Sequence, residues 1–137
     1  MNRVRRSSAI VALGLLVAAS GCSNEARVSG SVKLDGKRLD TGVVSFHPVG
    51  EGPIAIGQID DSGDYTAAVG SGGGFAPGDY IVTVVANEPM IPAKDPRMAP
   101  MPGKLITPQM YASKERSDLK CTLKAGSNTY DIAITSK

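Results

Sequence analysis

The two cysteines are the most reactive side chains that this 137-residue sequence offers, because a deprotonated sulfur is a strong nucleophile. Cys121 lies in the alternating run LKCTL at residues 119–123, which places its side chain on the same face as two leucines. We therefore expect Cys121 to be a small buried hydrophobic residue without a catalytic or redox role. Cys22 has different neighbours, because an apolar run and then Ala19-Ser20-Gly21 precede it. Its sulfur is the candidate for covalent modification.

Residues 1–21 have the composition of an export signal. Arg3, Arg5 and Arg6 come first, and an apolar run of eleven residues follows from Ala9 to Ala19. At about 1.5 Å per residue, such a run is too short to cross the roughly 30 Å hydrocarbon core of a bilayer. A positive start, a short apolar run and small residues before a cleavage point are typical of a signal that is removed on export.

The segment Ala19-Ser20-Gly21-Cys22 resembles a bacterial lipobox, with Ala19 where that motif prefers leucine. The resemblance implies cleavage before Cys22 and acylation of this cysteine, so that acyl chains attach the protein to a membrane. Two or more chains anchor a protein stably, because each buried methylene contributes about 0.8 kcal/mol. Ser23 replaces the aspartate that commonly retains lipoproteins at the inner membrane, so the resemblance favours the outer membrane. The alternative is an ordinary cleaved signal in which Cys22 is incidental.

Removal of the signal changes the charge of the chain. The sequence has 15 basic and 13 acidic residues, and three of the arginines lie in the signal, which leaves 12 basic residues against 13 acidic ones. Because the charge is balanced and no cluster of Lys and Arg occurs, we expect no nucleic-acid partner. After a lipidated linker at 22–25, residues 26–137 suit one small domain.

The other reactive side chains form no recognisable catalytic set. His47 is the one histidine, and a metal site needs several converging ligands. The acidic segment at 60–64 could hold calcium, and its carboxylates Asp60, Asp61 and Asp64 could serve a hydrolase, but the same residue types favour a hairpin turn. We predict no catalytic residue, no metal and no cofactor, and we keep a hydrolase with loop carboxylates as an alternative.

Two further alternatives concern binding. The soft thioethers of Met90, Met98, Met101 and Met110 could select monovalent copper, or they could anchor a loop on the sheet. Glycan binding usually needs exposed aromatic side chains. The sequence has no tryptophan, and its tyrosines at 65, 80 and 130 fall at predicted inward positions, which leaves Phe75 and Tyr111 as loop candidates.

The elements that position these residues follow from a period-two alternation that starts at Ala26. Turn residues interrupt it about every eight to twelve residues, which is typical of an all-β sandwich, and no amphipathic helix of useful length occurs. We predict about seven strands: one from Ala26 to the Asp35-Gly36 turn, then 42–48, 54–60, 65–69, 80–86, 118–124 and 129–135, with the last two forming a hairpin.

Residues 87–110 interrupt this pattern. They contain six of the nine prolines and all four methionines that follow the signal. Proline removes a backbone donor and fixes φ, so we expect an extended segment outside the sheet. A loop of this length in a small domain is functional or disordered, and it is our candidate contact surface.

Five segments occur in order along the mature chain: Val28-Ser29-Gly30-Ser31-Val32 with Leu34-Asp35-Gly36-Lys37; Val44-Ser45-Phe46-His47-Pro48; Asp61-Ser62-Gly63-Asp64-Tyr65; Pro77-Gly78-Asp79-Tyr80 with Val82 and Val84; and Pro108 with Tyr111. In this order they resemble the transthyretin-like, carboxypeptidase regulatory-like β-sandwich modules of small exported bacterial lipoproteins. The resemblance implies a seven-stranded Greek-key sandwich and a non-catalytic role. Enzymes of the wider group that hydrolyse a urate product use several histidines and a C-terminal Tyr-Arg-Gly-Ser, which this chain lacks.

These observations together predict an exported, membrane-anchored protein of the cell envelope. Its partners would be the membrane, through acyl chains on Cys22, and an envelope protein or glycan that contacts the 87–110 loop. We expect a structural or interaction role and no enzymatic activity. A binding module for glycan or a soft metal is the first alternative.

Overall fold

The computed structural model describes residues 24–137, so the predicted signal, its recognition residues Ala19, Ser20 and Gly21, and the predicted lipid site Cys22 lie outside the described residues. The described chain contains strands and one 3-10 turn, with no α-helix, and no helix in it is long and apolar enough to span a bilayer. The elements in chain order are β1 (Ala26–Leu34), β2 (Lys37–Arg38), β3 (Val43–Pro48), β4 (Ala55–Gln58), β5 (Asp64–Ala67), β6 (Gly78–Val85), η1 (Gln109–Ala112), β7 (Lys120–Leu123), β8 (Gly126–Thr129) and β9 (Ile132–Ile134).

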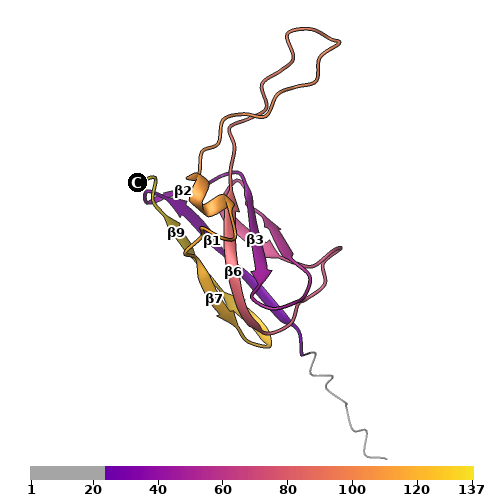
Figure 1. Ribbon diagram of the computed structural model, residues 1–137, viewed down its shortest axis with the longest axis vertical. Helices are drawn as coiled ribbons and strands as arrows, with labels where there is room; N and C mark the ends of the chain where they lie inside the picture. The colour runs from indigo at the N-terminus through magenta and orange to yellow at the C-terminus, as the bar shows by residue number, and fades with distance from the viewer. Residues whose placement is uncertain (1–23) are drawn as a thin grey trace, which may run out of the picture.

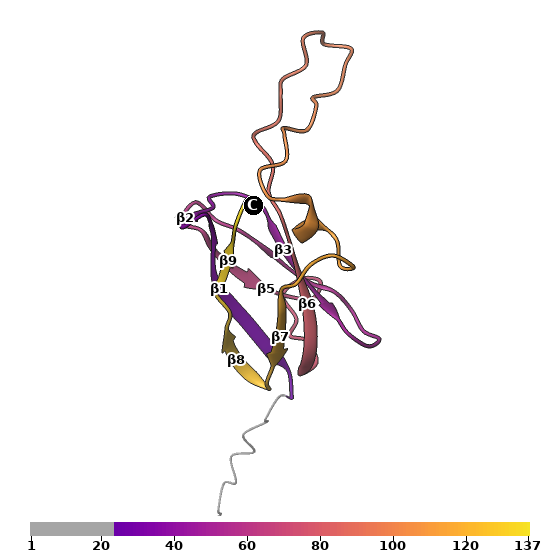
Figure 2. The same ribbon diagram turned by 60° about the vertical axis from the view of Figure 1, so that its left-hand side comes forward.

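The strands form two sheets that pack face to face (Figures 1 and 2). One sheet is antiparallel, in the order β4-β3-β6-β7. The other is mixed: β2 and β5 pair antiparallel with β1, and β8 and β9 pair parallel with β1. The all-β prediction is therefore confirmed, and the two layers are those of a sandwich.

The core lies between the sheets and follows the predicted alternation. Val28 and Val32 of β1 and Val44 of β3 are almost completely buried, whereas Arg27, Ser29 and Lys33, which alternate with the valines of β1, are exposed. Phe46 lies at the centre of an aromatic cluster, with ring centroids 6.0 to 6.5 Å from those of Tyr65, Phe75, Tyr80 and Tyr130. Aromatic rings at such separations add to the stability that burial alone provides.

The predicted final hairpin is wrong. β7 pairs with β6, whereas β8 and β9 pair with β1, so the turn after Leu123 carries the chain from one sheet to the other. The Asn128 side chain supports this crossing: its amide donates to the carbonyls of Lys124 and Arg27, at 2.8 and 3.0 Å. One amide thus closes the turn and attaches it to β1, which a two-stranded hairpin would not require.

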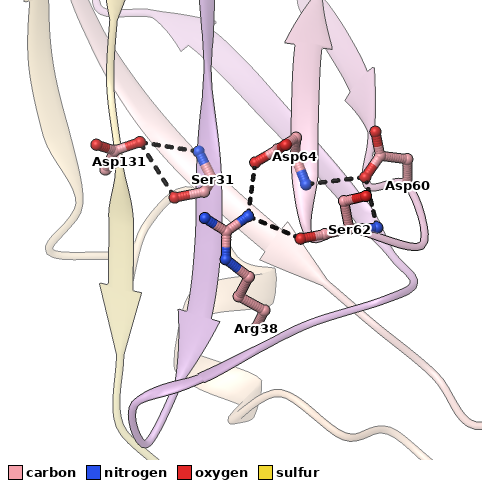
Figure 3. A network of polar contacts seen from close by, with 6 residues as sticks. All are labelled: Ser31, Arg38, Asp60, Ser62, Asp64 and Asp131. Carbon is pink, nitrogen blue, oxygen red and sulfur yellow. Dashed lines mark hydrogen bonds and ion pairs between the residues drawn. The ribbon is translucent and has the colours of Figure 1, made fainter.

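The last strand is broken into β8 and β9 at Tyr130-Asp131. The Tyr65 hydroxyl donates to the Tyr130 carbonyl at 2.5 Å, and this carbonyl occupies the space that a β-carbon on Gly30 would need. The Ser31 amide, which faces the break, donates to the Asp131 carboxylate at 2.9 Å (Figure 3). A side chain thus replaces the missing backbone acceptor, so the Ser31 amide is not left unpaired.

Candidate functional site

The most distinctive feature of the surface is an arm, residues 87–105, that extends away from the sandwich after β6 (Figures 1 and 2). Its two limbs run antiparallel and are joined by backbone hydrogen bonds. Ile91 donates to Met101 at 2.9 Å and accepts from it at 3.1 Å, and Glu88 donates to Lys104 at 2.8 Å. The arm is therefore a narrow ribbon with its own backbone pairing, not an irregular loop.

The base of the arm is held closely to the sheet. The Asn87 side-chain amide donates to the Gly103 carbonyl at 3.0 Å, and a β-carbon on Gly103 would collide with the Glu88 carbonyl. The returning limb then joins β6, because Ile106 donates to Ala86 at 2.8 Å. A small residue at 103 thus allows the two limbs to approach closely where the arm leaves the body.

The tip of the arm is a tight turn that Asp95 builds. Its carboxylate accepts from the Arg97 amide at 2.9 Å, and its carbonyl accepts from the Met98 amide at 2.9 Å. Asp side chains commonly stabilise turns by accepting from backbone two residues further on. The turn leaves the cationic side chains of Lys94 and Arg97 exposed.

Large apolar side chains cover the arm. Met90, Ile91, Met98 and Met101 are between 54% and 63% exposed, and they make up four of the seven exposed large hydrophobic residues in the described chain. Three of the four methionines predicted for the contact loop therefore lie together on the arm. Met110 lies apart from them, because it belongs to η1 and is partly buried against the core.

A groove of about 760 Å³ lies at the base of the arm. Its walls come from the start of β3, the ends of β4 and β6, and the outgoing limb of the arm; the lining residues are Asp40, Thr41, Gly42, Val43, Gln58, Ile59, Val85, Asn87, Glu88, Pro89, Met90 and Ile106. Asp40 and Glu88 are the charged residues of this lining. Within residues 24–137 the one ion pair joins Arg38 to Asp64, so neither groove carboxylate has a cationic partner there.

The acidic segment at 60–64 is occupied by its own turn. One Asp60 carboxylate oxygen accepts from the amides of Ser62 and Asp64, at 2.9 and 3.0 Å, and the Arg38 guanidinium pairs with Asp64 at 3.0 Å (Figure 3). These contacts are those of a hairpin turn. In the part of the chain that the structure describes, no three His, Cys, Asp or Glu side chains gather as a metal site would require.

His47 and Cys121 both lie in settings that favour their neutral forms. The His47 ring is 3.0 Å from the Thr83 hydroxyl, and burial, with a contribution from the Lys114 ammonium, lowers the pKa of His47. Cys121 is half-buried against the core, and burial together with the nearby Asp79 carboxylate raises the pKa of its thiol to about 11. A thiol with such a pKa is a poor nucleophile at neutral pH.

Phe75 and Tyr111, the predicted loop aromatics, are not available for glycan stacking. Phe75 is 3% exposed, and its ring lies edge-on to Tyr80 with centroids 5.4 Å apart. It is buried because its backbone pairs with Ala26, which extends the β1 sheet beyond the predicted strand. Tyr111 is 7% exposed and belongs to the core cluster.

The groove was not predictable from the sequence. Asp40 and Glu88 are far apart in the chain, and neither lies in a motif; the pairing of β3 with β6 brings their segments to one end of the sandwich. Neither a model of a known protein family nor a curated protein matches the chain. The resemblance to transthyretin-like lipoproteins therefore stays a prediction.

Proposed function

We propose that the protein is a non-enzymatic, lipid-anchored module of the bacterial cell envelope, and that its arm is the surface that contacts a partner. The observation that carries this proposal is the position of the arm. The arm lies at the pole of the molecule opposite to the N-terminal end of the described chain (Figures 1 and 2), and it carries four exposed apolar side chains.

The proposed lipid anchor lies at the end of the molecule opposite to the arm. Cys22 precedes the described chain by two residues, so acyl chains on it would attach the molecule near the start of β1, at Ala26. The arm would then extend away from its attachment point. Contiguous exposed apolar surface is uncommon on monomeric soluble proteins and usually marks an interaction site.

The proposal includes a transthyretin-like Greek-key fold. Counting β8 and β9 as one interrupted strand, and leaving the two-residue β2 aside, gives the seven principal strands that this fold requires. The parallel pairing of the first strand with the last, within one sheet, supports the same assignment.

Binding of a soft metal is the second candidate, because three methionines lie on one ribbon. A hydrolase that uses the carboxylates at 60–64 has less support, since Asp60 and Asp64 are engaged in the turn. Glycan binding also has less support, since both loop aromatics are buried.

Photo-crosslinking in cells tests the role of the arm. A photoreactive amino acid is placed at Met98 on the arm and, as a matched control, at Ile54, an exposed apolar residue between β3 and β4. We expect the arm position to yield a discrete crosslinked product and the control position to yield none. Absence of any product from Met98 and from Met101 would contradict the proposal.

A further inference from the structure

We infer that the partner of the arm is a second copy of this chain, and that the arm tip of each copy lies in the basal groove of the other. This inference rests on the proposed role of the arm as the contact surface, and it names the partner. The charges of the tip and the groove, the position of the groove and the prolines of the arm each support it.

The tip and the groove have complementary charge. Lys94 and Arg97 are exposed at the tip and have no ion-pair partner within residues 24–137, while the groove presents Asp40 and Glu88, which also have none there. The remaining arm charges leave this complementarity in place: the Asp95 carboxylate, which accepts from the Arg97 amide, lowers the net charge of the tip from +2 to +1, and Lys104 is not part of the groove lining. Complementary charges favour encounter and fix the register of a complex.

The position of the groove determines how two copies would meet. The outgoing limb of the arm forms one wall, through Glu88, Pro89 and Met90. A second arm lying in the groove would therefore run alongside the first, in the opposite direction, and the N-terminal ends of the two copies would lie at opposite ends of the pair (Figures 1 and 2). Both proposed Cys22 anchors reach one membrane only if the long axis of the pair lies along its surface, so the inference includes this orientation. The arrangement is isologous, because each tip meets the base of the other arm and both contacts are equivalent under one twofold axis.

Side-by-side arms would also cover the exposed apolar side chains. Met90 and Met101 near the base of one arm would face Met98 near the tip of the other, and Val43 and Ile106 supply apolar surface within the groove. Burial of apolar surface contributes about 25 cal/mol per Å². Burial of the apolar side chains would supply the affinity of the dimer, while the charged groups of the tip and the groove would set its register.

The prolines of the arm direct the contact to side chains. Exposed ribbon edges commonly bind further strands through backbone hydrogen bonds, and proline blocks this pairing because it has no amide donor. The arm has prolines at positions 89, 92, 96, 100 and 102. Recognition through side-chain charge and shape selects a matching groove more strictly than backbone pairing would.

Reversal of the charges at the arm tip or in the groove tests the inference. The full-length chain is used, expressed in cells and analysed in their membranes. One variant carries Lys94→Glu with Arg97→Glu at the tip, and a second carries Asp40→Lys with Glu88→Lys in the groove. Each also has a photoreactive residue at Met98 and a distinct epitope tag. The matched control is Lys33→Glu with Lys37→Glu, two exposed cations on β1 and β2.

We expect the unmodified chain and the control to give a crosslinked dimer, with Met98 joined to groove residues. Each charge-reversed variant alone should give about tenfold less dimer, because like charges then face each other. Coexpression of the two variants should restore the dimer as a mixed product, since in the mixed pair both tips meet grooves of opposite charge. Restoration cannot arise from misfolding of either variant.

Three results would overturn the inference: no dimer from the unmodified chain, equal dimer yield from all variants, or crosslinks that join Met98 to a different protein or only to lipid. The last result would leave the proposed contact role of the arm intact and remove only the second copy as its partner. Loss of every crosslinked product from the arm would instead contradict the proposed function itself.

Discussion

Gly30 is the residue on which the pairing of the first and last strands depends most. The Tyr130 carbonyl points toward it in order to accept from the Tyr65 hydroxyl, and no side chain fits in that space. The alternation of β1 predicted that Val28 and Val32 face the core, and the structure agrees. It could not predict why position 30 is glycine, because the cause lies 100 residues away in the sequence.

Replacing this glycine should destabilise the fold. We expect Gly30→Ala to lower the free energy of unfolding by on the order of 3 kcal/mol, because the new methyl group overlaps a backbone carbonyl that cannot move without loss of the Tyr65 hydrogen bond. Gly50→Ala is the control, since no atom lies near its β-carbon position, and it should change stability by less than about 0.5 kcal/mol. Urea unfolding of the two variants measures the difference, and equal effects would contradict the explanation.

His47 should make the fold sensitive to mild acid. Burial and the Lys114 ammonium lower the pKa of His47 below its ordinary value of 6.5, although the Glu115 carboxylate opposes them. The unfolded chain therefore binds a proton that the folded chain does not, and the stability present above pH 6.5 decreases as the pH falls through that value. His47→Gln should lose less stability than the unmodified chain between about pH 7.5 and about pH 5.5. Parallel pH profiles of unfolding would show that this histidine is not the cause.

At the scale of elements, the sequence predicted which residues form strands more reliably than which strands pair. Alternation and turn residues located β1 and the strands from β3 to β7, because these signals are local, whereas the two-residue β2 was not predicted. The final hairpin was predicted wrongly, since pairing of β8 with β1 joins the two ends of the chain and depends on the Asn128 contacts. Proline content correctly indicated that residues 87–110 lie outside the strands, but it gave no sign that residues 87–105 form a paired ribbon or that Gln109 and Met110 belong to η1.

The arm should be dispensable for folding, because its side chains lie outside the core. Replacement of residues 90–101 by a Gly-Gly turn keeps the Asn87 to Gly103 contact at the base. We expect a change in the free energy of unfolding of less than about 1 kcal/mol, against about 3 to 5 kcal/mol for the core substitution Phe46→Ala. Urea unfolding measures both. A shortened protein as unstable as the Phe46→Ala variant would show that the arm is part of the cooperative fold.

At the scale of the whole molecule, the proposed function depends on the relation between two poles. The arm and its acidic groove occupy one end, and the described chain begins at the other (Figure 1). The sequence predicts a membrane anchor at the second of these ends, because the export signal and the cysteine are continuous motifs, and this anchor stays a prediction. The groove end was not predictable, since its residues come from four separate segments of the chain.

The proposed function depends most on membrane attachment through Cys22, at the pole opposite to the arm. Intact-mass measurement of the native protein, extracted from membranes and compared with its Cys22→Ser variant, tests it directly. We predict that the native protein begins at Cys22 and carries acyl chains on that residue, while the variant carries none and leaves the membrane fraction. A native mass without acyl chains, or a variant that remains with the membranes, would contradict the account.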